Sequence, residues 1–431
     1  MAKTSSTEAN NPTNLQEGSG AGLWICTLFA AEEIPAAIVT FVSLLMFLQL
    51  GTPIAEATLF TALISIPWIL KSFMRSWVRR TGYFKQVIHI VEGLLFLSLI
   101  AIALTFPMGR YWLLPALFVV NLLAAWHALA ASMYYERMLY PRYQRFYNRL
   151  KGFAAQTSVV MTYGVLIIVV GLLEIRLHNY SQAWPRAWSM GCYMIAGVFL
   201  LFTLLHLLIL RRPAVGNNML QSSLARSWKA EVHVIERIRR QPDWWRDVLM
   251  LLLLLLPQSL MFQSRVYFLW ATPEMGGLGS TIQDIGFAQG TVGVIAFSLG
   301  IALGRRISHK HAQEHLFWPL SLALGLSPLI YLIMSFYPPQ TLMHLCGATF
   351  SAQLLFGLGL TVCKTLVQHI SGERYRNTIN LLYIPLISAC MLAPMAISGW
   401  LVQAMGFQNF FILNTLSAPV AWCMIGLLRK K

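Results

Sequence analysis

The sequence predicts an all-α membrane protein with twelve transmembrane helices in two pseudo-symmetric bundles of six. Three observations predict it: the composition, the spacing of apolar runs, and the distribution of Lys and Arg. The 431 residues are 57% hydrophobic and only 11% charged, whereas a soluble globular domain has about a quarter charged residues. Lipid is therefore the expected solvent for most of the chain.

Twelve apolar runs are long enough to cross a bilayer. A helix rises 1.5 Å per residue, so about 20 residues span the hydrocarbon core of about 30 Å. Backbone polar groups must be satisfied within the segment in lipid, which favours helices over strands. The runs lie near 22–50, 54–73, 84–107, 111–135, 153–173, 187–210, 247–270, 282–304, 315–337, 341–369, 377–403 and 408–428.

The basic residues predict how these helices are oriented. Of the 32 Lys and Arg, 28 lie in the two terminal tails and in the segments that follow the even-numbered runs. The others are Arg110, Arg176, Arg186 and Arg265. Cytoplasmic loops collect positive charge, so both termini are expected in the cytoplasm of a multi-pass protein of the bacterial inner membrane. The net charge of +16 then reflects topology and contact with lipid headgroups, and no nucleic-acid partner is expected.

The longest connection between apolar runs divides the chain into two halves. We expect a disordered cytoplasmic tail over 1–21, an N-terminal bundle over 22–210, a cytoplasmic linker over 211–246 and a C-terminal bundle over 247–431. Apolar residues at helical spacing predict an amphipathic helix over 219–240 on the inner membrane surface. Basic segments after the second helix of each half, at 71–80 and 305–310, predict matching cytoplasmic turns. Two six-helix halves are the architecture of the major facilitator fold.

Several stretches resemble a known family. The sequence reads A-A-E-E-I-P at 30–35 and I-P-W-I-L-K at 66–71. It reads G-G-L-G at 276–279, G-T-V-G-V-I-A at 290–296, I-S-G-W at 397–400 and G-F-Q-N-F-F at 406–411. Together these stretches, which span almost the whole chain, are similar to segments of the AmpG-like branch of the major facilitator superfamily, the muropeptide permeases, and especially of its Bacteroidetes members.

The resemblance implies an importer of cell-wall fragments, such as anhydro-muropeptides or amino sugars, that works as a proton symporter. The chain departs from the pattern where relatives carry charge. It has Arg79 in the first cytoplasmic turn, Ser132 and Met133 in the segment where relatives have two aspartates, and Gln258 and Gln263 on the seventh helix. These departures indicate that the cargo or the energy source differs from that of the relatives.

Ionisable residues inside the membrane are the candidates for proton coupling, because each costs at least about 2.5 kcal/mol there. Glu32 and Glu33 lie near the middle of the first helix, just before Pro35. Adjacent residues point about 100° apart on a helix, so one carboxylate can face a cavity while the other packs between helices. His89 and Glu92 share a face of the third helix and could relay protons. The alternative for each is a structural pairing.

Other polar residues could bind a solute. His127 beside Trp126 could stack on a sugar and hydrogen-bond it. Lys364 either reaches the inner surface or offers a positive charge to an anionic cargo, and Arg265 near the outer end of the seventh helix has the same two interpretations. Five amide side chains could hydrogen-bond hydroxyl groups or simply join helices: Asn121, Gln258, Gln263, Gln353 and Asn380.

No enzymatic motif occurs in the sequence. It contains no Walker loop, no H-E-x-x-H, no G-x-S-x-G and no paired cysteines, so we expect no cofactor, no metal and no ATPase domain in this chain. The expected partners are membrane lipid and a small-molecule substrate. Two alternatives to the importer stay open: an exporter of drugs or metabolites with the same fold, and a non-transporting receptor or assembly factor.

Overall fold

The fold is given by a computed structural model, which describes residues 21–81, 83–139, 141–211, 242–310, 313–371 and 379–429, with a few positions between 232 and 240. These ranges are helical with short connections and contain no strand. The predicted N-terminal tail and most of the predicted amphipathic helix over 219–240 lie outside them.

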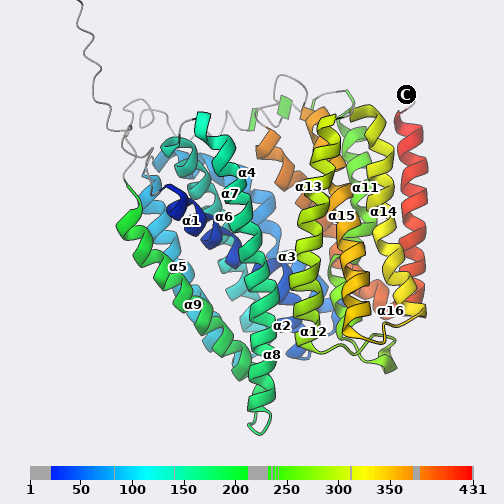
Figure 1. The fold of residues 1–431 in the computed structure, drawn as a ribbon, viewed down its shortest axis with the longest axis horizontal. Coiled ribbons are helices and arrows are strands. Elements are labelled where there is room, and N and C mark those ends of the chain that lie inside the picture. Colours follow the sequence, from blue (N-terminus) through cyan, green and yellow to red (C-terminus); the bar gives the residue numbers. More distant parts are fainter. Residues whose placement is uncertain are drawn as a thin grey trace, which may run out of the picture.

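The first six membrane spans form one bundle, coloured blue to green in Figure 1. Their helices are α1 (Ala21–Ala37), η2 (Ile38–Val42), α2 (Ser43–Gln49), α3 (Ile54–Ile64), α4 (Ile66–Thr81), α5 (Phe84–Thr105), η3 (Phe106–Met108), α6 (Arg110–Met138), α7 (Pro141–Val159), η4 (Val160–Val165), α8 (Leu166–Leu177) and α9 (Ala183–Ile209). We call this bundle the N-half.

The remaining spans form the second bundle, the C-half, beside the first (Figure 1). Its elements are α11 (Trp244–Trp270), η5 (Pro273–Met275), α12 (Ile282–Ile285), η6 (Gly286–Gly293), α13 (Val294–Lys310), α14 (Gln313–Phe336), α15 (Leu342–Ser371) and α16 (Ile379–Arg429).

Among the described residues, eleven helices are long and apolar enough to cross a membrane, and the last of them extends over 43 residues from Ile384 to Gly426. The backbone of this long segment leaves the helical conformation at Gly406, with φ 74° and ψ 168°. Glycine adopts positive φ without the steric cost that a Cβ would bring. The segment therefore contains two spans, and the predicted number of twelve is confirmed.

Large apolar side chains are exposed on the outside of both bundles. Leu208 on α9 is 84% exposed and Phe153 on α7 is 71% exposed. An exposed apolar surface of this kind marks contact with a membrane or a partner. Here it surrounds helices of membrane-spanning length, as expected for a surface in contact with lipid.

The basic segments at 71–80 and 305–310 are helical, so the prediction of turns there was wrong. Helix α4 continues to Thr81 and α13 continues to Lys310. Neither segment contains Gly or Pro, so nothing in the chain interrupts the helix where the hydrophobic run ends. Both helices therefore project their basic residues beyond the apolar part.

Within the described ranges, three membrane spans contain a π-helical segment: η2, η4 and η6. Segments η4 and η6 face each other across the boundary between the halves, and two glycines bring their backbones together. A Cβ on Gly290 would lie 2.1 Å from the carbonyl oxygen of Tyr163, and one on Gly164 would lie 2.5 Å from Oγ1 of Thr291. These two glycines therefore allow a close contact that joins the two halves.

Replacing Gly290 with alanine should separate these backbones. We expect the free energy of unfolding to fall by about 1–3 kcal/mol, the usual effect of overpacking. Thermal unfolding of the purified protein in detergent measures it. The control is Gly347→Ala on α15, where an added Cβ meets nothing within 4 Å. A Gly290→Ala protein as stable as the control would contradict the tight contact.

Candidate functional site

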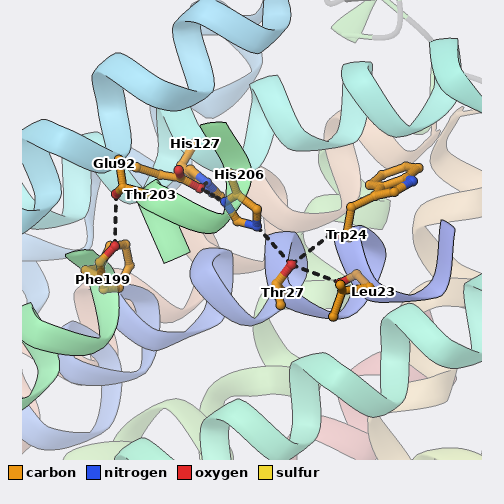
Figure 2. Close-up of polar contacts among 8 residues, drawn as sticks. All are labelled: Leu23, Trp24, Thr27, Glu92, His127, Phe199, Thr203 and His206. Carbon is orange, nitrogen blue, oxygen red and sulfur yellow. Dashed lines mark hydrogen bonds and ion pairs between the residues drawn. The ribbon is translucent and has the colours of Figure 1, made fainter. Parts of the chain in front are cut away.

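A buried network of polar side chains lies inside the N-half (Figure 2). Oε1 of Glu92 on α5 lies 3.1 Å from Nε2 of His127 on α6 and 2.6 Å from Nδ1 of His206 on α9. All three residues are fully buried. Nε2 of His206 lies 2.9 Å from the hydroxyl of Thr27 on α1. The network therefore joins four helices of one bundle.

The available donors constrain the protons in this network. The hydroxyl of Thr27 has one hydrogen, and its oxygen lies 2.9 Å from the carbonyl oxygen of Leu23. When Thr27 donates to Leu23, Nε2 of His206 must donate to Thr27. The contact between Nδ1 of His206 and Glu92 then requires one more proton, on the imidazole or on the carboxyl group. In this arrangement the network holds a proton without exposure to solvent.

Glu92 contacts His127 and His206 on two other helices. It does not hydrogen-bond His89, the partner that the spacing on the third helix predicted. His89 forms no hydrogen bond through either ring nitrogen in the described part of the chain, although it lies within electrostatic range of Glu92. His127 lies in the network, and its Nδ1 has no partner there. Its neighbour Trp126 is partly buried and packs against the hydrophobic core. The sequence identified Glu92 and His127 separately, but not their contact or the part played by His206.

A second group, which we call the N-half charge cluster, consists of Glu32 and Glu33 on α1, Lys71 on α4 and Lys151 on α7. Glu33 lies within electrostatic range of both lysines, and Glu32 lies within electrostatic range of Glu33 and Lys71. Glu32 is 9% exposed, and its Oε2 has no hydrogen-bond partner among the described residues. Charges of both signs thus meet where the sequence predicted only the two glutamates.

Aromatic rings hold both lysines of the N-half charge cluster. Nζ of Lys71 lies 4.4 Å from the ring centroid of Trp68, and Nζ of Lys151 lies 3.9 Å from that of Phe29 and 5.6 Å from that of Tyr135. These distances are within the range of cation–π interactions. Sequence reasoning assigned both lysines to topology because they lie at the ends of apolar runs. The sequence offered a signal only for Lys71, because Trp68 lies three positions before it on the same helix. Phe29 is distant from Lys151 in the sequence, so nothing there indicated their contact.

A third group lies between the halves, around Arg265 on α11. The guanidinium carbon lies 5.2 Å from the ring centroid of Phe262 and 5.9 Å from that of Phe356 on α15. Tyr163 of η4 lies within electrostatic range of this arginine, and its ring stacks on Phe41 of η2 at 5.0 Å. We call Arg265, Phe262, Phe356, Tyr163 and Phe41 the interface arginine group.

Amide side chains of the C-half form their own chain of hydrogen bonds. Nε2 of Gln353 donates to Oε1 of Gln289 at 3.2 Å, and Nε2 of Gln289 donates to the hydroxyl of Tyr331 at 2.9 Å. Tyr331 lies within electrostatic range of Tyr163. This chain therefore adjoins the interface arginine group, and Gln353 is the member that the sequence identified.

The other predicted residues lie apart from these groups or join helices. Nε2 of Gln258 donates to the carbonyl of Leu324 at 2.8 Å, and Nδ2 of Asn121 donates to that of Ile64 at 2.5 Å. Nε2 of Gln263 donates at 3.3 Å to the carbonyl of Thr40, across the boundary between the halves.

The last two predicted residues lie on C-half helices, Lys364 on α15 and Asn380 at the start of α16. Lys364 is exposed on α15, within electrostatic range of Arg305. It does not meet Glu32, Glu33 or His127. The side chain of Asn380 lies outside the described part of the chain.

By sequence, the chain matches no family model and no curated protein. Its structure is similar to many solved structures. One is a bacterial homologue of the human lysosomal transporter Spinster in an inward-facing, unoccupied conformation, with 15% identity, a TM-score of 0.68 and coverage of 96% of this chain and 98% of the other.

Two further structures extend the comparison. A D323A mutant of the nucleoside transporter NupG has 13% identity, a TM-score of 0.69 and coverage of 94% and 99%. A structure from work on substrate recognition in proton-dependent oligopeptide transporters has 11% identity, a TM-score of 0.66 and coverage of 95% and 98%. The chain has the major facilitator fold. At these identities the likeness establishes the fold and leaves the muropeptide branch a matter of sequence resemblance.

The buried network predicts a large effect of removing Glu92. Glu92→Leu leaves two buried histidines without their shared acceptor, and we expect the free energy of unfolding to fall by about 3–5 kcal/mol. The control is Glu56→Leu, because Glu56 pairs with Arg110 at 3.4 Å on the surface, where the two side chains are 41% and 28% exposed. That change should cost less than about 1 kcal/mol. Equal losses in detergent unfolding would contradict a stabilising network.

Proposed function

We propose that the chain is a secondary transporter of a small polar solute that works by alternating access of its two halves. The observation that carries the proposal is the N-half charge cluster. Charged groups inside a membrane bundle are costly and mark solute or ion pathways. Here Glu32 keeps a carboxylate oxygen without a partner, so the cluster can still accept a hydrogen bond or a cation from a solute.

The composition of the cluster favours a solute with charges of both signs and a hydroxylated body. The lysines match a carboxylate, the free oxygen of Glu32 matches an ammonium group, and the rings of Trp68 and Phe29 offer faces on which a sugar can stack. Anhydro-muropeptides combine all three features, and amino sugars combine two. The sequence resemblance to muropeptide permeases supports the same class of cargo.

The proposed direction, import, rests on the sequence resemblance to muropeptide permeases, and the proposed energy source, the proton gradient, rests on the carboxylates of the N-half charge cluster. The distribution of basic residues supports cytoplasmic termini in the inner membrane. Glu32 and Glu33 are the proposed coupling carboxylates, because protonating Glu33 changes its attraction to Lys71 and Lys151, and protonating Glu32 changes its attraction to Lys71. Glu92 and its two histidines are a second place where a proton can reside, with His89 beside them.

Neutralising Lys71 should remove binding of an anionic cargo. We expect Lys71→Met to lower the initial rate of uptake of radiolabelled anhydro-muramyl tripeptide into proteoliposomes at least tenfold. Arg176→Met serves as the control, since Arg176 is an exposed cation on α8. Wild-type protein that takes up neither this tripeptide nor an amino sugar, with or without a pH gradient, would refute the proposed substrate and favour a receptor.

Removing the charge of Glu33 should uncouple transport from protons. In wild-type proteoliposomes with an acidic exterior, uptake should be faster than without a gradient. With Glu33→Gln this acceleration should disappear while exchange of cargo at equal pH continues. Glu174→Gln on α8 is the matched control. An unchanged acceleration in both the Glu33→Gln and Glu32→Gln proteins would exclude these residues as the coupling site, and faster efflux than uptake would favour an exporter.

A further inference from the structure

Arg265 is a buried cation without a counter-charge in the part of the chain that the structure describes. Its side chain is only 4% exposed, and Nε has no hydrogen-bond partner among the described residues. No carboxylate in the described part of the chain forms an ion pair with it. Buried charges in proteins are normally paired, because an unpaired one loses its hydration with no compensation. The rings of Phe262 and Phe356 compensate only in part.

A second buried donor, which has no hydrogen-bond partner among the described residues, lies within electrostatic range of this arginine. Tyr163 is 2% exposed, and its hydroxyl has no hydrogen-bond partner in the same ranges. The two residues come from different halves, since Tyr163 belongs to η4 and Arg265 to α11. A guanidinium and a hydroxyl together are suited to bind one anionic group, because both donate hydrogen bonds and the guanidinium supplies the charge.

The surroundings narrow the kind of anion. The stacked rings of Phe41 and Tyr163 lie on the side of the N-half, and the ring of Phe262 on α11 of the C-half lies 5.9 Å from that of Phe41. A planar carboxylate fits beside a guanidinium that lies against aromatic rings. The adjoining hydrogen bonds of Gln353, Gln289 and Tyr331 offer amide and hydroxyl groups to a hydroxylated neighbour of that carboxylate.

We infer that the interface arginine group binds the carboxylate of the transported solute, with Arg265 of the C-half and Tyr163 of the N-half as its two donors. The inference rests on the proposed transport function and adds a specific contact to it. The N-half charge cluster and the interface arginine group then act on different parts of one solute. A sugar acid, in which a carboxylate is attached to a hydroxylated ring, has the required chemistry.

Two sugars that differ in one carboxylate test this inference. N-acetylmuramic acid carries a lactyl carboxylate that N-acetylglucosamine lacks. We expect the purified full-length protein in detergent to bind the acid at least tenfold more tightly than the neutral sugar in calorimetric titrations. Arg265→Gln should abolish this preference, Arg265→Lys should keep part of it, and Tyr163→Phe should weaken binding of the acid by a smaller factor.

The control is Arg176→Gln, which should bind the acid as the wild type does. A folded Arg265→Gln protein that still prefers the acid tenfold would overturn the inference while leaving the transport proposal intact. If the wild type binds neither sugar, thermal stabilisation by lactate and by inorganic phosphate is the deciding measurement. Stabilisation of the wild type but not of Arg265→Gln would keep the anion site and refute the sugar substrate, and no stabilisation of either would refute the anion site.

Discussion

The energetic cost of a charge in hydrocarbon is the constraint on which the interior of this protein depends. Most Lys and Arg lie at the ends of helices or outside the apolar runs, where water and lipid headgroups hydrate them. The few charges that lie deeper need compensation from the protein or from a solute. The N-half provides much of this compensation itself, through opposite charges, aromatic rings and two histidines that share one carboxylate.

The two halves differ in how completely they meet this requirement. In the N-half, lysines face glutamates and Glu92 has two imidazole partners. In the C-half, Arg265 has aromatic rings around it but no carboxylate among the described residues. Under the proposed transport function, a bound solute supplies at the boundary the counter-charge for Arg265 that the described residues do not.

The sequence was sufficient to predict the helices because bilayer thickness sets the length of each apolar run, and the backbone polar groups of such a run are satisfied in lipid only by a helix or a closed barrel. It also identified Glu32, Glu92, His127 and Arg265, since ionisable residues in apolar runs are conspicuous. It could not reveal that His206 contacts Glu92 from 114 positions away, or that Lys151 faces the first helix. Such contacts depend on the rotation of each helix about its axis, which an apolar run in a membrane leaves undetermined.

The π-helical segments change which side chains of a helix face the neighbouring bundle. Phe41, Tyr163 and Gln289 lie within η2, η4 and η6, at the boundary between the halves. A π segment inserts a residue into the helical turn, which shifts the following side chains by about 100° relative to an unbroken α-helix. The position of such an insertion along a helix decides which residues face the partner bundle. Moving one of these π-helical insertions by a single turn would therefore present a different set of side chains to the boundary between the halves.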